Sequence, residues 1–209
     1  MTNNYKPTLI YIGDPMCSWC YGIAPELDKV KNHFGEKLDY EVVMGGLRPY
    51  NTQTMSELKS FLTDHWQHVK QASQQPFNYD ILNNTSITYD TEPPCRAVVA
   101  VRQIDNSKSL SFFKNVQSAF YKDNKNMHLV ESYYDALNSV NIDKREFTEL
   151  FNSDQLKNDV KKDFQMAASL GVNSFPTILL KVGKEYSVIA KGYAKGEEMI
   201  SLINDYNKK

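Results

Sequence analysis

The chain of 209 residues has only three cysteines, no long apolar run and almost no net charge. No stretch approaches the roughly 18 consecutive apolar residues that a membrane-spanning helix needs. The 24 Lys and Arg side chains nearly balance the 25 Asp and Glu side chains, which leaves a formal charge of -1. Since a nucleic-acid-binding protein usually presents a basic face, we expect neither a nucleic acid nor a membrane as partner.

The beginning of the sequence also lacks the pattern of a secretion signal. No charged segment is followed by a long apolar stretch and a small-residue cleavage site. We therefore expect a cytoplasmic protein. Three cysteines are too few for a disulfide scaffold. In a reducing compartment, the pair Cys17 and Cys20 is more typical of redox chemistry or metal binding than of a structural bridge.

Short β-rich runs at both ends of the chain enclose a long helical block. Strands are predicted by the runs at 8–13, 38–44, 177–182 and 186–191. A helix should open near Cys17 and reach Phe34, with a kink at Pro25. Between 54 and 170 nearly every window has a helical period, and a last amphipathic helix follows the fourth strand.

The order of these elements is βαβ, then helices, then ββα. Neither end has enough strands for a sheet of its own, whereas together they make a small α/β domain. We therefore predict one domain from residues 1–46 and 172–209, with residues 47–171 as an all-helical insertion that could shape a substrate groove. Within the insertion, Thr54 with Glu57 and Asp143 with Glu146 predict helix caps.

The pair Cys17 and Cys20 lies where the first strand has ended and a helix begins. Disulfide exchange requires a thiolate that attacks sulfur. Unpaired backbone N–H groups in the first turn of a helix favour such an anion. We expect Cys17 to be the attacking thiolate and Cys20, one turn further, to be the resolving thiol.

A metal site is the main alternative interpretation of the cysteine pair. Structural zinc usually needs four ligands, and of the remaining Cys and His residues only His65 and His68 have paired spacing, so no metal is expected. Trp19 should cover the helix end and could also act as an apolar lid beside the sulfur. Asp14 either forms a turn ahead of the helix, which is the commoner case, or tunes the thiol.

Three segments carry a family resemblance: DPMCSWCYGIAP, TEPPCRAVVAVR, and the late Phe175-Pro176-Thr177 before the hairpin. They resemble the thioredoxin superfamily in its DsbA-like branch, nearest to cytosolic FrnE-like proteins or predicted protein-disulfide isomerases. The resemblance spans the whole chain. It implies a thioredoxin-like fold with a large helical insertion and a redox-active Cys17–Cys20 disulfide. It also implies that Pro176 follows a cis peptide bond and lies against the sulfurs.

The resemblance also implies that Ser18, Trp19 and Phe175 line the active site beside Pro176. Two departures from the family pattern matter. The acidic residue that thioredoxin and DsbA carry six positions before the first cysteine is replaced by Tyr11. The pair Ser18-Trp19 is neither Gly-Pro nor Pro-His, so the sequence leaves open whether the protein is a net oxidant or reductant.

Cys95 lies at the start of a helix that Pro93 and Pro94 open. It is a candidate accessory thiol that could form a regulatory disulfide with Cys17. The commoner alternative is a small core residue beside Val98 and Val99.

The expected function is that of a thiol–disulfide oxidoreductase acting on protein or small-molecule disulfides, without a cofactor beyond the Cys17–Cys20 disulfide. Oxidised glutathione is a candidate substrate and glutathione a candidate co-substrate. The alternative is a glutathione-dependent transferase or isomerase of the kappa type, in which Gly45, Gly46 and Leu47 could line a small-molecule pocket. A third interpretation is a non-enzymatic module that binds a partner and has an incidental thiol pair. The sequence does not specify the oligomeric state.

Overall fold

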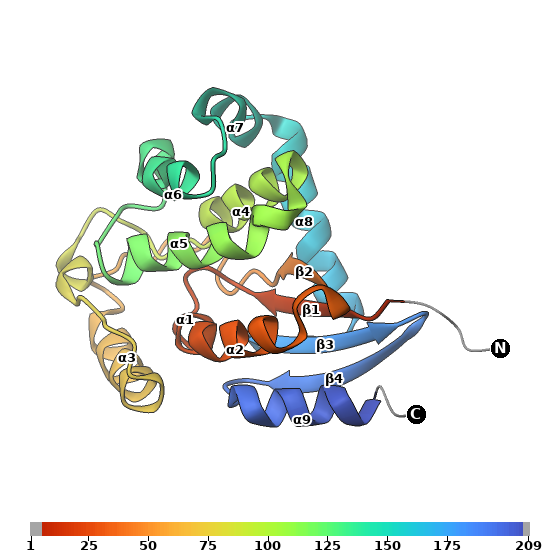
Figure 1. Ribbon diagram of the computed structural model, residues 1–209. Coiled ribbons are helices and arrows are strands. Elements are labelled where there is room, and N and C mark those ends of the chain that lie inside the picture. Colours follow the sequence, from red (N-terminus) through yellow and green to blue (C-terminus); the bar gives the residue numbers. More distant parts are fainter. Residues whose placement is uncertain (1–5, 207–209) are drawn as a thin grey trace.

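The structure is a computed structural model that describes residues 6–206. In this part of the chain, four strands form one mixed sheet in the order β2-β1-β3-β4. Strand β1 is parallel to β2 and antiparallel to β3, which pairs antiparallel with β4. The strands are β1 (Thr8–Gly13), β2 (Asp39–Met44), β3 (Thr177–Val182) and β4 (Glu185–Lys191). This mixed α/β sheet, with helices on both faces, is thioredoxin-like, as the sequence predicted (Figure 1).

The connection from β1 to β2 contains two helices, α1 (Ser18–Gly22) and α2 (Ala24–Phe34), where the sequence predicted one kinked helix. The break falls at Ile23, two residues before Pro25. Proline has no backbone N–H and its ring crowds the preceding turn, so the helix restarts with Pro25 in its first turn. Gly35, with a φ of 51°, ends α2 and begins the short 3-10 turn η1 (Gly35–Lys37).

Between β2 and β3 the chain is helical. The longer helices there are α3 (Lys59–Ser73), α4 (Glu92–Ile104), α5 (Ser109–Tyr121), α6 (Tyr134–Ser139), α7 (Lys144–Phe151) and α8 (Asp154–Ser169). Single 3-10 turns are η2 (Asp80–Asn83), η3 (Asn106–Lys108) and η4 (Val130–Tyr133). Helix α9 (Gly196–Tyr206) follows β4 and packs beside α2. In Figure 1, helices α4 to α7 lie above the sheet and α9 lies below it.

The two predicted helix caps have different outcomes. The Asp143 carboxylate accepts hydrogen bonds from the backbone N–H groups of Arg145 and Glu146, both at 2.9 Å, and so caps α7 as predicted. Thr54 and Glu57 also form their reciprocal hydrogen bonds. However, α3 begins only at Lys59, because Thr54 is held in a β-bridge to Thr88.

Helices α4 and α8 connect the helical segment to the sheet. Helix α4 is almost entirely buried and packs on α5, α7 and α8. The Arg102 guanidinium binds both carboxylate oxygens of Asp163 at 2.7 Å and also donates to the carbonyl of Val42 in β2. The same carboxylate accepts the N–H of Met44 at 2.8 Å. One partly buried ion pair therefore joins two helices to the edge strand.

The division into domains 1–46 with 172–209 and 47–171 stays a prediction, and residues 1–5 and 207–209 of the first domain lie outside the described residues. Within 6–206, none of the helices is long and apolar enough to cross a membrane.

Candidate functional site

Cys17 lies at the point where the chain leaves β1 and enters α1. It is the N-cap residue of α1, with extended backbone angles (φ -84°, ψ 117°), and its carbonyl accepts the N–H of Tyr21. Its own N–H donates to the carbonyl of Asp14 at 3.0 Å. The residue is 5% exposed, whereas Cys20 is fully buried. Cys17 is thus the outer member of the cysteine pair.

The loop before β3 provides the wall opposite Cys17. The peptide bond between Phe175 and Pro176 is cis. The thiol of Cys17 donates to the Phe175 carbonyl oxygen at 3.5 Å. The Phe175 ring lies over Gly45, where even a Cβ atom would come within 2.0 Å of the ring. The end of β2 therefore needs glycine for this loop to approach, and Phe175 reaches the cysteine across 158 residues of sequence.

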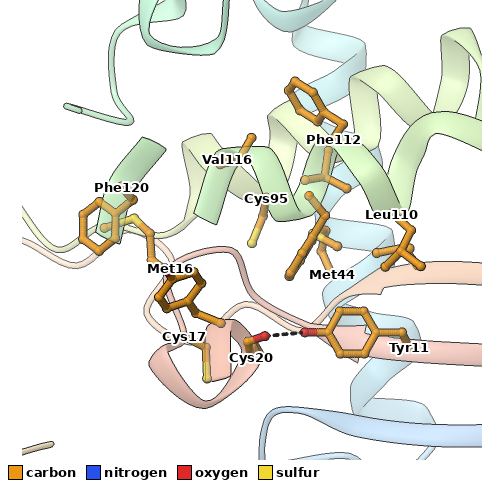
Figure 2. Close-up of a cluster of buried hydrophobic side chains, with 14 of the residues drawn as sticks. Tyr11, Met16, Cys17, Cys20, Met44, Cys95, Leu110, Phe112, Val116 and Phe120 are labelled. Carbon is orange, nitrogen blue, oxygen red and sulfur yellow. Dashed lines mark hydrogen bonds between the residues drawn. The ribbon is translucent and has the colours of Figure 1, made fainter. Parts of the chain in front are cut away.

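Cys20 lies within α1, one turn after Cys17, and is fully buried. Burial raises the pKa of the Cys20 thiol well above its ordinary value, and the neighbouring Cys17 sulfur raises it further. The hydroxyl of Tyr11 donates to the Cys20 carbonyl at 3.4 Å, as Figure 2 shows. Burial likewise raises the pKa of Tyr11 well above 10, so this hydroxyl stays protonated. Of the two cysteines, only Cys17 keeps any exposure to solvent.

Asp14 is the charged group closest in sequence to the pair, and it is fully buried. Its carboxylate accepts the N–H groups of Met16 at 2.8 Å and Leu47 at 2.7 Å, and the thiol of Cys95 at 3.4 Å. Burial raises the pKa of Asp14, while these hydrogen bonds oppose the shift. The bond to Met16 forms a turn of the kind the sequence suggested for Asp14.

Cys95 is buried on α4, and burial raises its pKa well above the ordinary value, with the adjacent Asp14 adding to the shift. In Figure 2 the sulfur of Cys17 points away from Cys95. All three cysteines are free thiols in this structure. The geometry thus gives Cys95 a hydrogen-bonded place in the core.

Trp19 belongs to a row of rings on the surface beside the cysteine pair, which we call the aromatic ridge. Its members are Phe61, His65, Trp19 and Tyr193. The Trp19 ring lies 6.2 Å from His65 and 5.9 Å from Tyr193, and His65 stacks on Phe61 at 5.7 Å. Burial lowers the pKa of His65, and His68 lowers it further, so the imidazole is neutral near pH 7.

Cations lie at both ends of the aromatic ridge. The Arg48 guanidinium is 5.9 Å from the Phe61 ring, and the Lys195 ammonium is 5.2 Å from the Tyr193 ring. Phe61 is 55% exposed and the other three rings are half-buried, so the aromatic ridge is a surface that can bind an apolar segment of a partner.

The structure thus brings Cys17, Cys20, Phe175 and Pro176 together, with Trp19 on the adjoining surface and the Ser18 side chain buried in the first turn of α1. In the described residues, no group of three or more His, Cys, Asp or Glu side chains is placed to hold a metal ion. Sequence reasoning missed the rest of the aromatic ridge. Phe61 and His65 are four residues apart, a spacing that could have placed them on one helix face.

Comparisons with known proteins agree with this geometry. A family model described as "Thioredoxin" matches residues 10–196. A candidate protein disulfide isomerase from Nitrosomonas europaea is 32% identical, with a TM-score of 0.88, and the match covers 97% of this chain and 98% of that one. The cytosolic disulfide reductase DsbM from Pseudomonas aeruginosa is 24% identical, with a TM-score of 0.80 and coverage of 96% and 98%.

DsbM has also been solved with GSH, and that structure has 21% identity, a TM-score of 0.76 and coverage of 97% and 100%. These matches agree with the mixed α/β fold described above. This chain belongs to the thioredoxin family, and its structural neighbours are DsbA-like.

Proposed function

We propose that this protein is a thiol–disulfide oxidoreductase in which Cys17 attacks and Cys20 resolves. One observation carries the proposal: the Cys17 sulfur lies at the opening of α1, 3.5 Å from the carbonyl of the residue before cis-Pro176, with Cys20 buried behind it. The site presents one accessible sulfur to a substrate and keeps a second within the same helix.

The reaction follows from this arrangement. The Cys17 thiolate attacks one sulfur of a substrate disulfide; a Cys17–substrate disulfide forms, and the other substrate sulfur leaves as a thiolate. Cys20 then loses its proton and attacks the Cys17 sulfur, which releases the second substrate thiolate. The substrate gains two electrons, and the protein is left with the Cys17–Cys20 disulfide. The raised pKa of Cys20 keeps this thiol protonated during the first attack.

The aromatic ridge is the surface that we assign to the substrate. An extended peptide whose cysteine meets Cys17 could place an apolar side chain on Trp19 and Phe61. A small disulfide such as oxidised glutathione carries carboxylates that Arg48 or Lys195 could bind. Support for the small substrate comes from the GSH bound in DsbM, which is also described as cytosolic. We accordingly propose a cytoplasmic reductase of protein or glutathione disulfides.

The glutathione transferase of the kappa type gains no support from the site. That chemistry uses a single Ser or Cys, whereas here two cysteines occupy the first turn of one helix. Gly45 and Gly46, which could have lined a small-molecule pocket, instead lie under the rings of Phe175 and Phe164.

Variants of the three cysteines test the function. With insulin or oxidised glutathione as substrate, Cys17→Ser should abolish turnover, and Cys20→Ser should accumulate a mixed disulfide at Cys17 that mass spectrometry detects. Cys95→Ser is the matched control, because a serine hydroxyl can still donate to Asp14. Its expected turnover is that of the unchanged protein, which would also argue against an accessory thiol. Turnover that survives in Cys17→Ser would refute the proposal.

A further inference from the structure

The peptide bond that leads into Cys17 is held at both ends. The carbonyl oxygen of Met16 accepts two tyrosine hydroxyls, from Tyr89 at 2.5 Å and from Tyr121 at 2.6 Å. The N–H of the same peptide unit, which belongs to Cys17, donates to the carbonyl of Asp14 at 3.0 Å. A peptide unit is planar, so fixing its oxygen and its N–H also fixes the Cα atom of Cys17.

Both tyrosines come from the helical segment between β2 and β3. Tyr89 lies just before α4, and Tyr121 is the last residue of α5. Their rings are fixed by neighbours: Tyr121 stacks on Tyr21 of α1 with centroids 4.7 Å apart, and Tyr89 stacks on Phe120 at 6.5 Å. The helical segment therefore reaches the cysteine loop through two rigid, buried side chains.

The two hydroxyls can serve only as neutral donors to this carbonyl. Burial raises the pKa of Tyr89 and of Tyr121 well above 10, so both keep their protons at any physiological pH. Two donors saturate the two lone pairs of one carbonyl oxygen. If either is removed, the buried oxygen loses a partner, and the peptide is freer to turn about its flanking bonds.

We propose that Tyr89 and Tyr121 are positioning residues that hold Cys17 in place through the Met16 carbonyl and thereby set the redox balance of the cysteine pair. This inference rests on the proposed function, since it concerns the same two sulfurs. The hydrogen bond from the Cys17 thiol to the Phe175 carbonyl exists only while Cys17 is reduced and protonated. If the peptide unit between Met16 and Cys17 can rotate, the hydrogen bond to Phe175 weakens and the reduced protein is destabilised. The oxidised protein is affected less, because the Cys17–Cys20 disulfide itself fixes the positions of the two sulfurs.

Tyr133 provides a matched control. It is also fully buried and also comes from the helical segment, and its hydroxyl also donates to a backbone carbonyl, that of Met127. Its ring packs on Phe147 and Phe151, away from the cysteine loop. Tyr133→Phe removes the same kind of hydrogen bond as Tyr89→Phe and Tyr121→Phe, but not one that bears on Cys17.

The test is the thiol–disulfide equilibrium of the whole protein in glutathione redox buffers, read by alkylation and mass spectrometry at Cys17 and Cys20. Each of Tyr89→Phe and Tyr121→Phe should shift the equilibrium constant toward the disulfide by about threefold, and the double variant by about tenfold. A tenfold change corresponds to a potential about 30 mV more negative. Tyr133→Phe should leave the equilibrium constant unchanged, even if it lowers the thermal stability as much as Tyr89→Phe or Tyr121→Phe does.

Equal constants for all variants would overturn the inference, as would a shift in Tyr133→Phe as large as that in the other two. Should the double variant fail to fold, the two single variants decide by the same criterion. A second measurement is the rate at which Cys17 is alkylated in the reduced proteins. This rate should change in the Tyr89 and Tyr121 variants only. If the unchanged protein forms no Cys17–Cys20 disulfide in any buffer, the proposed function itself is wrong and the inference falls with it.

Discussion

At the scale of single residues, the buried charge beneath the site is Asp14. Tyr11, which stands where thioredoxin and DsbA have an acid, contributes a neutral hydroxyl to the Cys20 carbonyl. Asp14 instead joins three stretches of chain: the cysteine loop at Met16, the loop after β2 at Leu47, and helix α4 at Cys95. Its role is to hold these backbones in register around the sulfurs.

Replacing this carboxylate by an amide should weaken the fold. In Asp14→Asn, one oxygen remains as acceptor and the other becomes an NH₂ donor, which faces either the Met16 or the Leu47 N–H. A buried N–H without a partner costs about 1–3 kcal/mol. Urea unfolding at neutral pH should show a loss of that size. A variant as stable as the unchanged protein would mean that water replaces the lost acceptor.

The pH dependence of this loss has a definite sign. Burial raises the pKa of Asp14 above its ordinary 3.8, so the folded protein holds the proton more tightly than the unfolded chain. The stability that this proton contributes is fully present below pH 3.8 and is lost as the pH rises through the folded pKa. Asp14→Asn does not titrate at this position, so its deficit relative to the unchanged protein should shrink from pH 4.5 to pH 7.5. A deficit that grows over this range would contradict the direction of the shift.

At the scale of elements, helix α3 contributes half of the aromatic ridge. Phe61 and His65 lie one turn apart on it, so their rings follow one another toward Trp19 on α1. Gly22 permits this approach, because a Cβ atom there would lie 2.8 Å from Val69 of α3. The ridge therefore depends on how closely α1 and α3 pack.

The exposed end of the ridge should contribute to substrate binding. For insulin reduction, Phe61→Ser should raise KM by about threefold to tenfold with little change in kcat, since the ring would bind substrate and transition state alike. Tyr186→Ser is the matched control: Tyr186 is also an exposed aromatic with a cation over its ring, Lys181 at 5.8 Å, but it lies on the β3–β4 hairpin. Equal effects of the two substitutions would remove the ridge from the binding site.

Elements set by local pattern were predictable from the sequence. The runs predicted at 8–13 and 177–182 coincide with β1 and β3, because short β-branched runs bounded by Gly, Asp or Pro leave little choice. The helix predicted from Cys17 to Phe34 was wrong in detail, since Pro25 divides it in two. The Thr54–Glu57 bonds form without starting a helix, because the distant Thr88 holds Thr54 in a bridge.

At the scale of the whole molecule, contacts across long stretches of sequence complete the site. Residues 17 and 20 could be identified from their spacing, and Phe175 and Pro176 through a family resemblance. The hydroxyls of Tyr89 and Tyr121 reach Met16 across 73 and 105 residues, and no periodicity marks them as different from other core tyrosines. Such contacts depend on how the helical segment sits on the sheet, which local sequence does not specify.

The partly buried ion pair between Arg102 and Asp163 allows a test of how the helical segment packs on the sheet. Asp163→Ala would leave the guanidinium buried without its partner, with only the Val42 carbonyl to accept from it, and the Met44 N–H would lose its acceptor. Breaking such a pair costs about 3–5 kcal/mol. Asp154→Ala at the start of the same helix removes only an exposed pair with Lys157, and exposed pairs contribute little to stability.

If the helices and the sheet unfold as one unit, two probes should report the same loss in Asp163→Ala. Far-UV circular dichroism follows mainly the helices, and amide hydrogen exchange of β1 and β3 in rising urea follows the sheet. Both midpoints should fall together, while Asp154→Ala leaves them in place. A helical transition that separates from that of the strands would show that residues 47–171 form an independent folding unit. The tyrosine contacts to Met16 would then depend on the docking of two units.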